Sequence, residues 1–379
     1  MATGSLHRVT DLEKAMRLLA TRVSWTMGAK FIDAASLYKS RGWDETIRVM
    51  RQQTMDGAMR ARATDSLVGV LNRHILIGGK QVFWYDWTRL NAAQLAGSRG
   101  WVRDVDADDL VGHPFEVLST PYLQGDLRPL LGSPPRLVSA QRERQRLTLV
   151  FFGVRTFTTR ESIDLTAMND DERSRFNDYL EVIGVKARNV PCFDVVVFDL
   201  AKNRVEVRMD RQPGMQSDGT DSAFSQIIEQ INRVIFTATG HMPIGHGLTN
   251  FFPAVNRLYR DPSAGMVEML GFVATARDKS SNNKGVVHRR DDQDLRVDPF
   301  HVGGKSAVGT VEPYTIGISA ESLSGVERLH LELRSSARTL LGGGNPRFIG
   351  HAMFEGCATS ADFDLLTSLL EDHLIDPAA

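Results

Sequence analysis

Apolar residues recur at helical spacing through roughly the first seventy positions. The first run consists of Leu12, Met16, Leu19 and Val23. Residues three or four apart lie on one face of a helix, so this run predicts an amphipathic helix. The capping-box pair Thr10 and Glu13 predicts where that helix begins. The same spacing predicts further helices at about residues 29–38, 44–53 and 59–72.

The pair Gly78-Gly79 separates two apolar runs in the segment HILIGGKQVFWYDW. A glycine pair between apolar runs is typical of a tight β-hairpin. All the tryptophans lie in the first 101 residues, as Trp25, Trp43, Trp84, Trp87 and Trp101. Prolines then punctuate residues 104–146, which favours a domain boundary there. We therefore expect residues 1–135 to form a helix-rich N-terminal domain with a Trp-rich β-hairpin.

Strand patterns dominate the rest of the chain and come in runs. Residues 147–157 predict a buried strand, and residues 192–210 predict a hairpin. Residues 224–235 and 359–374 place apolar side chains on one helical face each. Strands grouped in runs, with helices between the groups, favour an α+β fold. We expect residues 136–379 to form an α+β domain with a mixed, largely antiparallel sheet and packed helices.

Composition narrows the setting of the protein. The chain has no run of 18 or more apolar residues, so we expect no membrane-spanning helix and no membrane partner. Its two cysteines, Cys192 and Cys357, are too few for a disulfide framework and indicate buried thiols in a reducing compartment. We therefore expect a cytoplasmic protein.

Arginine is unusually frequent, although the net charge is only −1. Of the 45 basic residues, 36 are arginine, which binds phosphate and stacks on bases in ways that lysine does not. A GC-rich genome also produces this bias. Basic residues form three clusters, which are Arg136, Arg142, Arg144 and Arg146; Arg277, Lys279 and Lys284; and Arg289 and Arg290. Such loops suit phosphate contact, and solvated loops are the alternative reading because acidic residues follow two of the clusters.

The segment around the 192–210 hairpin resembles, in topology only, a metal-dependent nuclease core of the restriction-endonuclease type. Such a core has a carboxylate on one strand, Glu-x-Lys on its antiparallel partner and a helix packed against both. Here Asp199 (or Asp194) precedes Glu206 and Arg208, and these would hold Mg²⁺ and orient a water. Arg208 replaces the lysine and stays protonated. The alternative is an ordinary hairpin with Arg204, Glu206 and Arg208 on an exposed face.

Residues 288–301 contain arginine and aspartate in near balance, and we expect an exposed, salt-bridged connection without a metal. The preferred function is a non-catalytic subunit that contacts nucleic acid or serves in assembly within a bacterial nucleic-acid-directed machinery. Expected partners are nucleic acid, and a protein or a second copy of the chain. No cofactor is expected, except Mg²⁺ under the nuclease alternative. A protein-interaction scaffold is the third hypothesis.

Overall fold

The structure is a computed structural model of the 379-residue chain. It describes residues 3–375 apart from residues 54, 112–126, 165, 167, 177, 213–217, 246, 276–285, 290–291 and 342–346.

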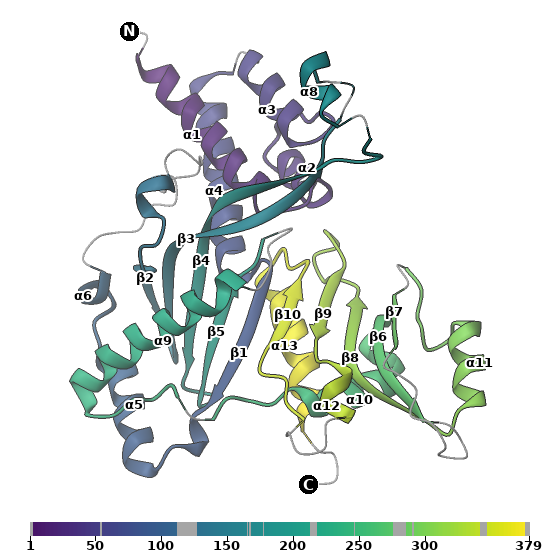
Figure 1. Ribbon diagram of the computed structural model, residues 1–379. Helices are drawn as coiled ribbons and strands as arrows, with labels where there is room; N and C mark the ends of the chain where they lie inside the picture. Colours follow the sequence, from purple (N-terminus) through teal and green to yellow (C-terminus); the bar gives the residue numbers. More distant parts are fainter. Residues whose placement is uncertain are drawn as a thin grey trace.

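One ten-stranded sheet runs through the described part of the chain, in the order β2-β3-β4-β5-β1-β10-β9-β8-β6-β7 (Figure 1). The strands are β1 (Lys80–Asp86), β2 (Arg136–Glu143), β3 (Arg146–Ser162), β4 (Ile183–Asp199), β5 (Arg204–Asp210), β6 (Met266–Thr275), β7 (Val286–Arg289), β8 (Thr310–Ala320), β9 (Leu329–Leu333) and β10 (Ala352–Glu355). Every pairing between these strands is antiparallel. The expected α+β fold with packed helices is therefore confirmed, with an antiparallel rather than a mixed sheet.

Four N-terminal helices cover one face of the first half of the sheet. They are α1 (Thr3–Ala20), α2 (Trp25–Ala34), α3 (Trp43–Gln52) and α4 (Gly57–Ile77). Their buried apolar residues share one cluster with Phe193, Val195 and Val197 of β4. Fully burying a side chain such as Leu12 or Leu67 stabilises the fold by about 1.5–3 kcal/mol, so helical spacing alone explains why this layer forms.

The predicted hairpin around Gly78-Gly79 is wrong. The residues before the glycines complete α4, whose buried positions Leu67, Leu71 and His74 follow helical spacing. Gly78 then ends the helix, with its N–H donating to the carbonyl of His74. Only the second apolar run is a strand, β1, and it pairs with β5 and β10 rather than with the run before it.

The opposite face of the first half-sheet is covered by α9 (Asp218–Thr239), which crosses the front of β2–β5 in Figure 1. Ile227, Ile231 and Ile235 recur every four residues and pack with Val205 and Val207 of β5. The helix predicted at residues 224–235 therefore lies within α9. Most of its apolar side chains pack toward the sheet, but Val234 is 46 % exposed. The strand β5 and the inner part of β4 are consequently buried on both faces.

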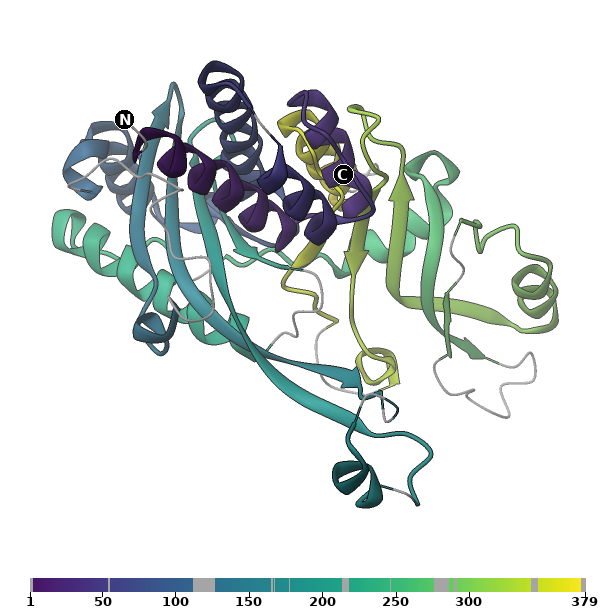
Figure 2. The same cartoon turned by 90° about the horizontal axis from the view of Figure 1, so that it is seen from above.

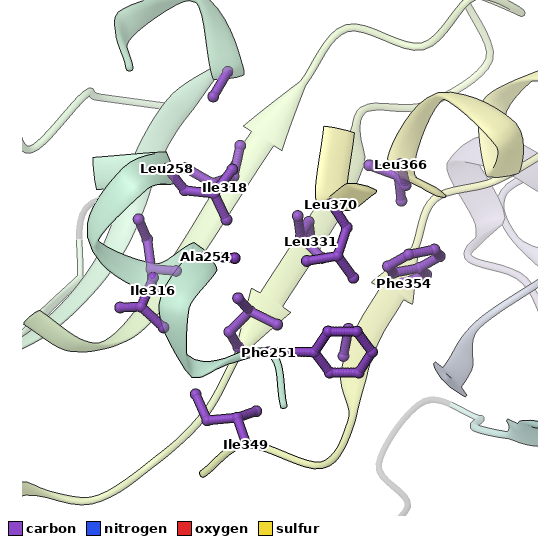
Figure 3. Packing of buried hydrophobic residues seen from close by; sticks show 14 of the residues in the cluster. Phe251, Ala254, Leu258, Ile316, Ile318, Leu331, Ile349, Phe354, Leu366 and Leu370 are labelled. Atoms are coloured by element: carbon purple, nitrogen blue, oxygen red, sulfur yellow. The ribbon is translucent and has the colours of Figure 1, made fainter. Parts of the chain in front are cut away.

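The second half of the sheet packs against α10 (Phe252–Arg260) and α13 (Ser360–Leu374). Figure 3 shows Leu258 of α10 beside Ile318 of β8, and Leu370 of α13 near Leu331 of β9. The predicted start of α13 is confirmed, because Thr359 forms a capping box at its N-terminus. Capping of this kind satisfies backbone N–H groups that the helix itself cannot.

The other described α-helices are α5 (Ala92–Asp104), α6 (Ala107–Val111), α8 (Asp170–Ser174), α11 (Pro299–Ala307) and α12 (Ala337–Leu341). No described helix combines the length and the apolar character needed to cross a bilayer. The sheet takes β1 from the range 1–135 and its other strands from the range 136–379. The boundary predicted near residue 135 thus separates the helices α1–α4 from most of the strands. The sheet nevertheless spans this boundary, because β1 lies on its N-terminal side.

Candidate functional site

The predicted nuclease residues do not converge on a site that could hold a cation. In the β4–β5 register, Asp199 lies opposite Arg204, and Glu206 lies opposite Val197. Asp199 accepts the backbone N–H groups of Ala201 and Lys202, each at 3.0 Å. Its second oxygen accepts Nε–H of Arg146 at 2.9 Å. The carboxylate therefore closes the β4–β5 turn.

Glu206 is buried in an ionic cluster of its own. The indole N–H of Trp84 donates to it at 2.9 Å, Arg204 donates at 3.3 Å, and Arg208 donates to its other oxygen. Burial opposes ionisation, but Arg208 and Arg204 hold the pKa of Glu206 below its usual range. The two guanidinium groups therefore neutralise the Glu206 carboxylate within the protein. Acceptor positions that Mg²⁺ would need are already filled by fixed donors.

The expectation that Arg204, Glu206 and Arg208 face solvent is wrong, because Glu206 is only 4 % exposed. The guanidinium of Arg204 stacks on Trp84, with Cζ 3.9 Å from the ring centroid. That of Arg208 lies 4.0 Å from the ring centroid of Phe363 on α13. Aromatic rings attract such cations, so the charged side of the strand lies in the interior. The helix α9 packs on the opposite side, away from Glu206.

Four of the predicted nucleic-acid-binding residues share the β2–β3 hairpin at one edge of the sheet. Arg136 is exposed, and Arg144 is exposed in the turn with a positive φ of 49°. Arg142 instead donates to the carbonyls of Arg103 and Val105 at the end of α5, where a cation complements the helix dipole. Arg146 pairs with Asp199. The hairpin thus leaves two arginines, rather than four, to contact a partner.

The remaining predicted residues are not brought to this hairpin. Arg289 ends β7, which is the opposite edge of the sheet from β2. With strands about 4.8 Å apart, the two edges of a ten-stranded sheet lie roughly 40 Å apart. Arg277, Lys279, Lys284 and Arg290 lie outside the described residues. The sequence clusters therefore do not form one basic surface among the residues described.

The 288–301 segment is salt-bridged as expected, but it is not exposed along its whole length. Arg296 chelates Asp294, and Arg328 pairs with Asp292. Its last residue, His301, is buried in α11 and accepts or donates a 2.9 Å hydrogen bond with Tyr259. Asp298 caps the start of α11, and the hydrogen bond with Tyr259 places His301, in the first turn of this helix, against α10. Among the described residues, no group of three metal-ligating side chains comes together.

The largest charged feature of the interior was not predicted. Arg22, in the connection between α1 and α2, donates to both carboxylate oxygens of Asp210 at 2.7 and 2.8 Å. Lys80 of β1 donates to the same carboxylate at 2.8 Å. Next to them, Arg155 of β3 pairs with Asp194 of β4. We call these five residues the buried charge cluster; none is more than 5 % exposed.

The buried charge cluster forms where the β4–β5 ladder opens. Regular pairing ends at Val195 and Arg208. Beyond it, the Asp210 carboxylate accepts the N–H of Phe193 at 2.9 Å, and the Asp194 carboxylate accepts the N–H of Asp210 at 2.7 Å. Carboxylates thus replace the missing ladder bonds. Buried backbone groups need such partners, so the cluster lets β4 leave β5 without orphaned N–H groups.

Electrostatics fix the protonation states around the cluster. Burial lowers the pKa of Lys80 to about 8, and Arg22 contributes, although Asp210 opposes the change. Burial disfavours the Asp210 anion, but Arg22 and Lys80 outweigh it and hold the pKa of Asp210 far below its usual range. Burial lowers the pKa of His74 to about 3 and raises that of Cys192 to about 12. His74 is therefore a neutral imidazole at pH 7, and Cys192 is an unreactive thiol.

One sequence signal could have revealed the cluster. Asp194 interrupts the apolar run CFDVVVF, and Lys80 begins the apolar run KQVFWY. A charged residue inside a strand buried on both faces needs a buried partner. The sequence could not say which partners these would be, because Arg22 and Asp210 are 188 residues apart.

A second feature is a two-stranded ribbon that leaves the sheet. The strands β3 and β4 pair along all 17 residues, from Arg146–Asp199 to Ser162–Ile183. However, β2 pairs only as far as Phe152 of β3. About ten pairs beyond that point span roughly 30 Å. Figure 2 shows this ribbon extending away from the body of the molecule, with α8 at its end.

The end of the ribbon carries exposed apolar side chains, which we call the ribbon tip. They are Ile163 (36 % exposed), Tyr179 (61 %), Leu180 (105 %), Ile183 (52 %) and Val185 (66 %). At the base of the ribbon, by contrast, Phe157, Val190 and Cys192 form a small buried cluster. The apolar residues at the tip therefore do not serve the packing of the described fold.

Comparison of the chain with protein-family models, with curated proteins and with solved structures finds no match. The function must therefore be argued from the geometry.

Proposed function

We propose that the protein is a non-catalytic assembly subunit that binds a protein partner through its ribbon tip. The observation that carries the proposal is the concentration of exposed apolar side chains, with Leu180 and Val185 the most exposed, at the end of a projecting ribbon. Grouped apolar side chains of this kind mark interaction surfaces, whereas single ones need no explanation.

The ribbon itself supports the same reading. A two-stranded ribbon in water is marginally stable without further packing, and its edges present unpaired backbone groups. From Gly153 outward, neither β3 nor β4 has a further strand partner among the described residues. A partner protein would bury the apolar tip and could pair with an edge of the ribbon. The proposal thus accounts for two exposed features with one contact.

The test uses the full chain and two variants of it. Each protein is isolated from its native cells together with any partner that it binds. Leu180→Ser with Val185→Ser changes the ribbon tip. Val234→Ser with Phe236→Ser is the matched control, because these residues are also exposed, at 46 % and 49 %, but lie on α9. Sedimentation velocity should show a larger species for wild type and control that is lost in the tip variant. Circular dichroism should be the same for all three.

The proposal fails if the tip variant keeps the sedimentation of wild type, or if wild type sediments as the bare monomer. A defined larger species with a stoichiometric second protein identifies the partner. A species whose mass is a multiple of the monomer mass, without a second protein, shows that the partner is another copy of the chain.

Nucleic-acid contact is the second candidate, favoured by one observation. Arg136 and Arg144 stay exposed at the two ends of the β2–β3 hairpin. These are the residues that we propose as phosphate contacts, in keeping with a role in a bacterial nucleic-acid-directed machinery. Arg142 and Arg146 have structural contacts, so changing them would confuse folding with binding.

The matched test is Arg136→Ala with Arg144→Ala, measured by fluorescence anisotropy on labelled single- and double-stranded oligonucleotides. Each lost phosphate contact should flatten the slope of log K against log salt by about 0.7–0.9. Arg48→Ala with Arg233→Ala, two exposed arginines on other elements, is the control. If wild type does not bind, or if the variant keeps the affinity and slope of wild type, the hairpin has no such role.

A further inference from the structure

The helix α11 reaches the interior of the protein through a single side chain. His301 is 3 % exposed, whereas every other residue of α11 is exposed, including the apolar Phe300 at 73 % and Val302 at 48 %. Figure 1 shows this helix beyond β6 and β7, at the end of the sheet. A helix on a protein surface normally buries a whole apolar face, so the attachment of α11 depends on His301 to an unusual degree.

The segment that carries α11 is fixed to the sheet at both of its ends. Before the helix, Leu295 is 1 % exposed, and its N–H donates to a carbonyl of β6 at 2.9 Å. After the helix, the N–H of Gly309 donates to the carbonyl of the last residue of β6 at 2.8 Å. Between these points, Gly303 and Gly304 weaken the helix, because glycine is a poor helix former. The segment is therefore tethered like a flap, which is able to open without unfolding of the sheet.

His301 is surrounded by groups that suit a neutral imidazole. Its Nε2 forms a 2.9 Å hydrogen bond with the hydroxyl of Tyr259 on α10, and its ring meets Phe272 of β6 with the centroids 5.5 Å apart. The ring centroid of His288 on β7 is 6.2 Å from that of His301. The Nζ of Lys305, one turn further along α11, is 5.1 Å from the centroid of the Tyr259 ring. The side chains from α10 and β6 carry no charge, whereas Lys305 is a cation and His288 becomes one in acid.

A proton on His301 opposes this arrangement. Burial lowers the pKa of His301 most, His288 and Lys305 lower it further, and Asp298, which caps α11, raises it. An unfolded histidine titrates near 6.5, so the released imidazole takes up a proton more readily than the buried one. The closed position of α11 is therefore fully stable above about pH 6.5 and loses stability as the pH falls below this value.

We propose that α11 is an acid-sensitive flap, which is closed while the His301 imidazole is neutral and opens when this imidazole takes up a proton. Opening uncovers the Tyr259 hydroxyl and the Phe272 ring, which are in residues only 6 % and 9 % exposed in the closed state. Both residues belong to the core of the second half of the sheet, and this core stays folded because Leu295 and Gly309 still hold the ends of the flap.

The test measures the mobility of α11 in the full chain with a nitroxide spin label on Gly304→Cys. Nothing lies within 4 Å of the Cβ position of Gly304, and the native thiols of Cys192 and Cys357 are buried, so the label attaches at position 304. The mobile fraction in the electron paramagnetic resonance spectrum should rise at least threefold from pH 7.5 to pH 5. The same label on Gly100→Cys in α5, whose Cβ position is equally open, is the matched control and should not change.

His301→Gln separates the proton from the other effects of acid, because glutamine is able to bond with the Tyr259 hydroxyl but does not titrate. In this variant, the label at position 304 should have the same mobile fraction at pH 7.5 and pH 5, whatever its level. His301→Leu replaces this variant if circular dichroism shows that it does not fold. A mobile fraction that does not change with pH in the chain with native His301 overturns the proposal. So does a rise that persists without the imidazole, or an equal rise at position 100, which reports acid unfolding of the whole chain.

Discussion

At the scale of single residues, buried carboxylates accept more hydrogen bonds than a carboxylate in a surface ion pair does. Asp210 accepts two bonds from Arg22, one from Lys80 and one from the backbone of Phe193. A buried pair is strongly destabilised when only one partner is removed, because the other charge stays buried. The contribution of Asp210 is therefore best seen by removing its charge alone.

Asp210→Asn should lower the free energy of unfolding by about 3–5 kcal/mol, because Arg22 and Lys80 lose their counter-charge. Urea unfolding followed by circular dichroism measures the change. Asp292→Asn is the control: Asp292 also pairs with an arginine, Arg328, but its side chain is 82 % exposed. That change should cost no more than about 1 kcal/mol. Equal effects of the two substitutions would contradict the role given to Asp210.

His74 should make the protein sensitive to acid. Its pKa in the folded state is about 3, whereas an unfolded histidine titrates near 6.5. The unfolded chain therefore binds one more proton between these values, and stability is lost as the pH falls from about 6.5. The loss approaches about 1.4 kcal/mol per pH unit from this residue alone.

His74→Asn should remove this contribution, because asparagine does not titrate in this pH range. The amide oxygen can still accept the hydrogen bond from Arg22. Unfolding free energies of wild type and variant, measured from pH 7 to pH 4.5, should converge as the pH falls. The difference between the two proteins isolates His74 from the other titrating groups. Parallel pH dependences would show that His74 is protonated in the folded state.

At the scale of elements, the regular helices were predictable and the joint between α4 and β1 was not. Helical spacing identified α1, α4, α9 and α13, because each buries one apolar face. The glycine pair was misread as a hairpin turn because two apolar runs flank it in either case. What separates the alternatives is the run before it, HILI, which continues the helical spacing of Leu67 and Leu71.

The structure gives another reason for glycine at this joint. A Cβ atom built on Gly78 would lie 2.2 Å from the His74 ring, which is itself buried and bonded to Arg22. Gly78→Ala should therefore cost about 1–3 kcal/mol through overpacking. Gly100→Ala in α5 is the control, because nothing lies within 4 Å of its Cβ position. There alanine should stabilise the helix by up to about 1 kcal/mol, and thermal melting distinguishes the opposite signs.

The candidate contact sites were predicted less well than the helices, for a physical reason. Sequence clustering grouped Arg136 and Arg144 in one basic loop, whereas the structure places both on the β2–β3 hairpin. It cannot show that Arg142 is used to cap α5, or that Arg289 lies at the far edge of the sheet. The buried charge cluster depends on contacts between distant segments, such as Arg22 with Asp210, which no local pattern encodes.

At the scale of the whole molecule, β1 joins the two halves of one sheet. Val82 pairs with Arg208 on one side and with Ala352 on the other. Both pairings span more than a hundred residues of sequence, which is why residues 1–135 looked like a separate domain. The composition of the strand KQVFWYD does not say which strands pair with it. Its apolar character on both faces does, in hindsight, fit a central strand.

The central place of β1 predicts that residues 136–379 do not fold alone. Without residues 1–135, β5 and β10 lose their shared partner, and Asp210 loses both Arg22 and Lys80. Expressed alone, this fragment should show no cooperative unfolding transition in urea. Co-expression with a fragment of residues 1–135 should restore a cooperative transition.

All five tryptophans lie in the shorter fragment, and Trp84 becomes buried against Glu206 only when the two fragments assemble. A blue shift of tryptophan emission therefore reports assembly, and a fragment 136–379 that unfolds cooperatively by itself would show that the sheet does not need β1.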